Sequence, residues 1–164
     1  MITIVWNNLA NTKFKAIYTY ECSRVADRYG RVTSGVLALT STSSVAAWAI
    51  WQQHPAIWGA IIGISQVAQV LKPYVPFIGS DKEFLEMSFE FDQLYLEYEK
   101  LWYAASAGSI DDAGLSQRIG ELHKKGLDIE KAHKNTRTPR RKQWVEKAYA
   151  ETENFLNLNF SGES

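Results

Sequence analysis

The sequence lacks charged side chains over one long stretch. From Val32 to Leu71, forty consecutive residues contain no Asp, Glu, Lys or Arg, although 22% of the whole chain is charged. A gap of this length would rarely arise by chance. It contains two apolar runs separated by the polar residues 52–55, and we interpret the pair as a membrane hairpin.

Other residues and motifs that the sequence lacks exclude several classes of function. The single cysteine, Cys22, permits no intramolecular disulfide and cannot by itself build a metal site. The apolar run begins only at residue 32 and lacks a small-residue cleavage pattern, so no secretory signal is expected. Glycine-rich phosphate loops, nucleophile elbows and zinc-ligand spacings are missing. Glu130 and His133 match half of a di-iron motif without its second half. We therefore expect no enzyme and no cofactor.

The two apolar runs have the lengths of membrane helices. Val32 to Trp51 is twenty residues, which spans a hydrocarbon core of roughly 30 Å. Ala56 to Leu71 is shorter, so the helix either continues through Lys72 with the lysine snorkelling or thins the bilayer locally. The flanking cations place both termini in the cytoplasm, and they are Arg24, Arg28, Arg31, Lys72 and Lys82. The alternative is a hairpin buried inside a soluble all-helical protein.

Small and polar residues within the hairpin favour self-association. Gly59 and Gly63 are spaced for close helix packing. Polar side chains at membrane depth either bind a neighbouring helix or line a wet path, and both interpretations remain open. The predicted pore or interhelix face consists of Ser34, Ser41, Ser44, Ser65, Gln66 and Gln69.

The rest of the chain predicts an all-α fold, with a two-helix transmembrane hairpin continuous with a cytosolic antiparallel helical bundle. The expected units are an N-terminal amphipathic helix over 1–31, the hairpin over 32–75 and a cytosolic helical region over 80–160. No proline interrupts the first helix before the first apolar run, so this helix should enter the bilayer directly. Ser80 and Glu83 predict a capping box, a Gly/Ser/Asp loop is expected at 108–112, and Thr138 with Pro139 predicts the start of the last helix.

Charge is neutral overall but unevenly distributed. Residues 81–100 carry seven acids and two bases, whereas residues 124–147 carry nine bases and three acids, so the two regions could pair. The densest basic patch is Arg137, Arg140, Arg141 and Lys142. A solvated or intramolecular face is the favoured interpretation of this patch, followed by anionic headgroups or a partner. Direct contact with nucleic acid is the least favoured.

An amphipathic N-terminal helix leads through Arg24, Arg28 and Arg31 into a short-tipped hairpin, and long helices end in Ala148-x-x-Glu151-Thr152-x-x-Phe155-Leu156. This arrangement resembles the SLATT group, which are two-transmembrane effectors of bacterial anti-phage defence. A retron-type two-transmembrane effector is similar. The resemblance brings no catalytic residue.

Membership of such a group would imply a toxin of the bacterial inner membrane. It would form homo-oligomers and permeabilise the membrane to cause abortive infection. A sensor or regulatory protein encoded nearby, either a nucleotide-signalling enzyme or a reverse transcriptase, would control it. The alternative function is a soluble helical scaffold or adaptor that binds a protein partner through its hydrophobic hairpin.

Overall fold

The computed structural model confirms the all-α class. It describes residues 1–41, 56, 59–60, 63–64, 66–67, 79–136 and 138–160, with side chains of the first helix described for residues 1–35. The four long helices in this part of the chain are α1 (Ile2–Ser41), α4 (Asp81–Ser106), α5 (Asp112–Ala132) and α6 (Lys142–Phe160). None of the described residues forms a β-strand.

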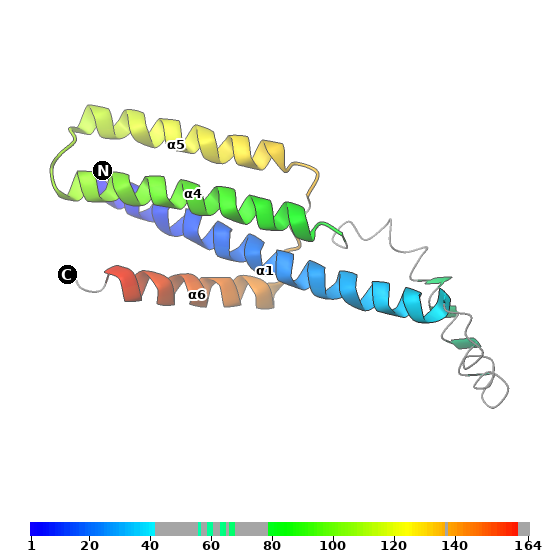
Figure 1. Cartoon of the computed structure of the whole chain (residues 1–164). Helices are drawn as coiled ribbons and strands as arrows, with labels where there is room; N and C mark the ends of the chain where they lie inside the picture. The colour runs from blue at the N-terminus through cyan, green and yellow to red at the C-terminus, as the bar shows by residue number, and fades with distance from the viewer. Residues whose placement is uncertain are drawn as a thin grey trace.

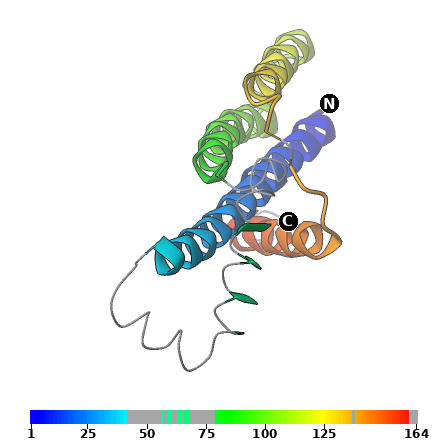
Figure 2. The ribbon, with the colours of Figure 1, turned by 90° about the vertical axis from the view of Figure 1, so that its right-hand side faces the viewer.

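The helices pack antiparallel around α1. Both α4 and α6 pack against α1, and α5 packs against α4 on the side away from α6. Figure 1 shows that α4 and α6 run opposite to α1, while α5 runs opposite to α4. The start of α1 and the end of α6 lie at the same end of the bundle, and α1 projects beyond the other helices at the opposite end (Figures 1 and 2). The predicted antiparallel bundle is therefore confirmed for the described helices.

Apolar residues spaced three and four apart form the main core between α1 and α4. Such residues share one helical face, so each helix buries a continuous stripe against the other. From α1 the stripe supplies Val5 and Leu9, and from α4 it supplies Phe91 and Tyr98, all of them buried. Leu122 of α5 joins the same core.

A smaller core ties α6 to the pair. It comprises Cys22 and Ala26 of α1, Phe84 of α4 and Ala148 of α6, all buried completely. Alanine and cysteine at these positions allow close approach of the helix backbones. The second core lies at the end of the bundle from which α1 projects.

The expected turn between α4 and α5 is present. Gly108 has a φ of +66°, a left-handed conformation that glycine adopts without a steric penalty. Asp111 then caps α5, because its side chain accepts a hydrogen bond from the Gly114 amide at 2.9 Å. The short turn makes α4 and α5 antiparallel neighbours.

One predicted capping box and one predicted helix start need correction. Ser80 is the N-cap of α4, but its side chain makes no capping hydrogen bond, and Glu83 instead accepts a hydrogen bond from Thr136 at 2.7 Å. The last helix begins at Lys142, not at Thr138 and Pro139. The Pro139 carbonyl accepts a hydrogen bond from the Tyr18 hydroxyl, whereas in a first helical turn it would accept from an amide four residues on.

Among the described residues, none of the helices combines the length and the low polarity needed to cross a bilayer. Most of the predicted hairpin over 32–75 lies outside the described residues.

Replacing Phe91 with alanine tests the α1 and α4 core. Phe91 is 1% exposed, whereas Phe89 on the same helix is 60% exposed. Removal of a buried phenyl ring leaves a cavity and should cost about 3–5 kcal/mol of unfolding free energy. Phe89→Ala is the matched control and should cost well under half of that. Urea unfolding followed by circular dichroism measures both, and equal losses would contradict the described core.

Candidate functional site

The distinctive feature of the fold is that α1 continues past its last cation. The helix runs without a break from the bundle through Arg31 and the first ten residues of the uncharged stretch, to Ser41 (Figure 1). The helix is therefore continuous into the uncharged stretch, whereas its entry into a bilayer stays a prediction. Val32 is 61% exposed and Ser34 is also exposed. Apolar surface therefore remains uncovered where the uncharged stretch begins.

Further along, Gly59, Gly63 and Gln66 are helical and exposed. No described atom lies within 4 Å of a Cβ placed on either glycine. Close helix packing at this pair therefore stays a prediction. The Ser41 side chain and the residues Ser44, Ser65 and Gln69 lie outside the described part of the chain, so the predicted polar face is described only at Ser34 and Gln66.

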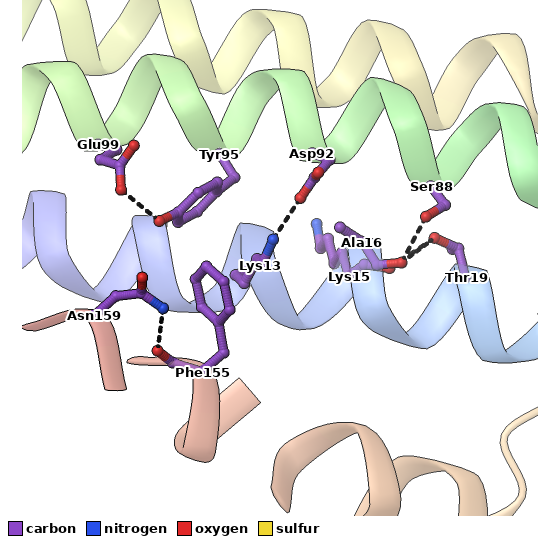
Figure 3. A network of polar contacts seen from close by, with 10 residues as sticks. All are labelled: Lys13, Lys15, Ala16, Thr19, Ser88, Asp92, Tyr95, Glu99, Phe155 and Asn159. Atoms are coloured by element: carbon purple, nitrogen blue, oxygen red, sulfur yellow. Dashed lines mark hydrogen bonds and ion pairs between the residues drawn. The ribbon is translucent and has the colours of Figure 1, made fainter. Parts of the chain in front are cut away.

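A polar network inside the bundle fixes α4 and α6 against α1. The Lys13 ammonium lies 2.6 Å from the Asp92 carboxylate, and it stands 4.6 Å and 4.2 Å from the ring centres of Tyr95 and Phe155 (Figure 3). Ser88 donates a hydrogen bond to the Ala16 carbonyl at 2.9 Å. The charged and hydrogen-bonding groups of three helices are therefore paired with one another, which indicates a structural role.

Glu21 links α1 to α6 in a similar way. Its buried carboxylate accepts hydrogen bonds from Lys147 of α6 at 2.8 Å and from Arg24 at 2.9 Å. Burial raises the pKa of Glu21, but the hydrogen bonds from Lys147 and Arg24 outweigh burial and hold that pKa below its usual value. The carboxylate is therefore ionised at neutral pH and sets the register of α6 on α1.

The predicted pairing of acidic and basic regions is confirmed in part. Lys125 of α5 contacts Glu97 of α4 at 2.6 Å, and His133 contacts Glu90 at 2.9 Å. The predicted basic patch does not join this pairing in the described part of the chain. Its members Arg140, Arg141 and Lys142 are exposed, and Arg137 lies outside the described residues. Lys142 lies 3.6 Å from Glu146 of its own helix.

Tertiary contacts decide where this basic patch lies. The Tyr18 hydroxyl binds the Pro139 carbonyl, 121 residues away in sequence, and burial raises the pKa of Tyr18 to about 12, so the hydroxyl keeps the proton that it donates. The described part of the patch, Arg140, Arg141 and Lys142, adjoins the start of α6, and this start lies at the end of the bundle from which α1 projects (Figure 1). Sequence reasoning missed this placement, because nothing local in the sequence relates Tyr18 to Pro139.

The described residues hold no group of three or more His, Cys, Asp or Glu side chains that could bind a metal ion. Both residues of the half motif contact other partners, because Glu130 pairs with Lys15 and His133 pairs with Glu90. A groove of about 320 Å³ lies between α1, α4 and α5. Asn8, Tyr98 and His123 are among the residues that line it. The Asn8 side-chain oxygen lies 3.3 Å from the His123 ring, so these polar groups already contact each other.

Comparison with models of known protein families, with curated proteins and with solved structures finds no match. The function of this chain is therefore inferred from its own residues.

Glu21→Gln tests the contact between α1 and α6 through its pH dependence. A carboxylate with a lowered pKa stabilises the fold above the unfolded pKa of about 4.5, and this contribution disappears as pH falls through the lower folded value. We expect the variant to lose about 1 kcal/mol at neutral pH. When the pH is lowered from about 5 to 3, the unfolding free energy of Glu21→Gln should fall by less than that of the wild type.

Glu153→Gln serves as the control, because Glu153 is exposed and has no ion pair among the described residues. Unfolding midpoints across this pH range are the measurement. Parallel acid profiles for wild type and Glu21→Gln would contradict the assigned role.

Proposed function

We propose that this chain is a membrane effector that oligomerises and permeabilises the bacterial inner membrane to cause abortive infection in anti-phage defence. Residues 32–75 form the hairpin in the bilayer, and both termini with the helical bundle lie in the cytoplasm. The observation that carries the proposal is the uncharged stretch entered by α1, in which Val32, Ile64 and Val67 are 61%, 64% and 57% exposed.

Exposed aliphatic side chains favour insertion into lipid. Full burial of a Val or Ile side chain is worth about 1.5–3 kcal/mol relative to leaving it in water. The bundle does not provide that burial for these three residues, although its own cores are well filled. Lipid can bury these side chains, and no charged group has to leave water because the stretch contains no charged residue.

Oligomerisation follows from the polar and small residues of the same stretch. Gly59 and Gly63 present an uncovered backbone surface, and small residues at this spacing allow two helices to pack closely in lipid. Ser34 and Gln66 are exposed polar groups, for which lipid is a poor environment. Assembly of several copies turns these groups toward neighbouring helices or toward a central water-filled path, through which ions dissipate the membrane potential.

A trigger is needed because a permanently open pore would kill the host. The resemblance to two-transmembrane defence effectors supports a regulatory partner encoded nearby, either a nucleotide-signalling enzyme or a reverse transcriptase. The partner restrains or assembles the effector through the cytoplasmic bundle. The chain itself then supplies only the membrane lesion, without catalytic residues.

A soluble helical scaffold or adaptor is the second candidate. It is favoured by the hydroxyl side chains of the first apolar run, since seven of them lie between Thr33 and Ser44. In this case the exposed Val32, Ile64 and Val67 would contact a protein partner.

Cell fractionation separates the two candidates. The effector should remain in the membrane pellet after alkaline carbonate washing and require detergent for release. Ile64→Lys should weaken retention, because a lysine at membrane depth costs about 2.5–3.5 kcal/mol. Phe89→Lys, at an exposed position of α4, is the matched control and should leave retention unchanged. Recovery of the wild type as a monodisperse species without detergent would favour the adaptor.

Expression in bacteria with a membrane-potential dye tests the lesion. We expect toxic expression to depolarise the cells. Changing Gly59 and Gly63 to Ile should relieve both effects, because the larger side chains prevent close helix approach. Gly120→Ile is the control, since no described atom lies within 4 Å of a Cβ at this position of α5. Toxicity without depolarisation would contradict pore formation, and unchanged toxicity of the glycine variant would indicate another interface.

A further inference from the structure

The end of the bundle from which α1 projects carries an excess of unpaired cations. Several carboxylates there are neutralised internally, because Glu21 binds Arg24 and Lys147, and Asp27 binds Arg31. Asp81, Glu83 and Glu86 have no ion pair in the described part of the chain. Neither do five cations of this end, which are Arg28, Lys82, Lys134, Arg140 and Arg141. The surface at this end is therefore net positive.

The helix register places part of this surface close to the start of the uncharged stretch. Lys147 of α6 contacts Glu21 of α1, and the two helices are antiparallel (Figure 1). Tyr149 of α6 also stacks on Phe14 of α1, so Arg141, eight residues before Tyr149, lies near the level of Cys22, eight residues after Phe14. Arg28 of α1 lies beyond this level and precedes Val32 by four residues, or about 6 Å along the helix axis. The polar headgroup layer on each side of a bilayer is roughly 5–8 Å thick.

The patch is held in this position by α1. The Pro139 carbonyl is bound by Tyr18, and Arg141 stacks on Trp144 with 5.4 Å between the guanidinium carbon and the ring centre. Trp144 in turn packs against the core formed by Cys22 and Ala26. A guanidinium that is fixed in place loses little entropy on binding, and its planar fork matches two phosphate oxygens.

We propose that Arg140, Arg141 and Lys142, with Arg28, bind the phosphate groups of anionic phospholipids in the cytoplasmic leaflet. The inference rests on the proposed membrane function, because the hairpin brings this end of the bundle to the lipid surface. Lipid phosphate is favoured over nucleic acid because Arg28 lies about one turn before the uncharged stretch and the other cations lie at the same end of the bundle. Binding holds the bundle close to the leaflet and thereby orients its other surfaces toward neighbouring copies in the same membrane.

The test uses the full chain in lipid nanodiscs with one fluorescent label. Gln143→Cys provides the labelling site, since Gln143 is exposed beside the patch. The native Cys22 should not react, because it is buried completely and burial raises its thiol pKa to about 12. A nitroxide on a lipid headgroup quenches the dye when the patch lies at the surface. Ser116→Cys reports the background, because Ser116 is exposed near the start of α5, at the other end of the bundle (Figure 1).

We expect stronger quenching at residue 143 in discs that contain phosphatidylglycerol than in discs of phosphatidylcholine alone, and we expect salt to reduce the difference. Each cation near an anionic surface strengthens attraction roughly fivefold, so Arg140→Gln with Arg141→Gln should lower the ratio of docked to undocked bundles roughly 25-fold. Lys100→Gln with Lys124→Gln removes the same charge from exposed residues elsewhere, and quenching should persist.

The proposal would be overturned by equal quenching in both lipids, by unchanged quenching in the double arginine variant, or by loss of quenching when soluble glycerol phosphate is added. The last would assign the site to free phosphate. Quenching relieved by a short DNA duplex in phosphatidylglycerol discs, but not by salt of equal ionic strength, would assign it to nucleic acid. Failure of the proposed membrane function is recognised separately, because the chain would then not enter the discs at all.

Discussion

The packing of α1 is the constraint on which the rest of the structure depends. One face of this helix contacts α4 and α6 and so organises the bundle, and the same helix continues into the uncharged stretch. A helix is stiff over this length, because each backbone amide is bonded to the carbonyl four residues earlier. The position of the bundle therefore determines the direction in which the uncharged stretch departs, and a change at one end is transmitted to the other.

The contacts around α1 divide into two kinds. Apolar burial supplies most of the stabilisation, through the large core with Phe91 and the small core with Ala148. Ion pairs such as those of Lys13 with Asp92 and Glu21 with Lys147 add less energy, but they link specific atoms across helices. They fix the register, and the register determines which exposed groups lie near the exit of α1.

This arrangement explains how a chain of zero formal charge has a positively charged surface at one end of the bundle. Carboxylates of α4 are used to hold α5, as in the contacts of Glu97 with Lys125 and Glu90 with His133. The cations of the segment before α6 find no such partner among the described residues and remain in solvent. The proposed membrane attachment and the proposed lipid contact thus depend on the same end of the bundle.

The sequence alone determined the helical class, the antiparallel packing, the absence of a break in the helix before the uncharged stretch and the loop at 108–112, because periodicity, loop length and glycine geometry are local properties. It did not determine that Glu83 contacts Thr136 or that α6 begins at Lys142. Both depend on groups more than fifty residues apart in sequence, such as Tyr18 and Pro139. Only the tertiary structure decided where the basic patch lies, because that position is set by the register of α6 on α1.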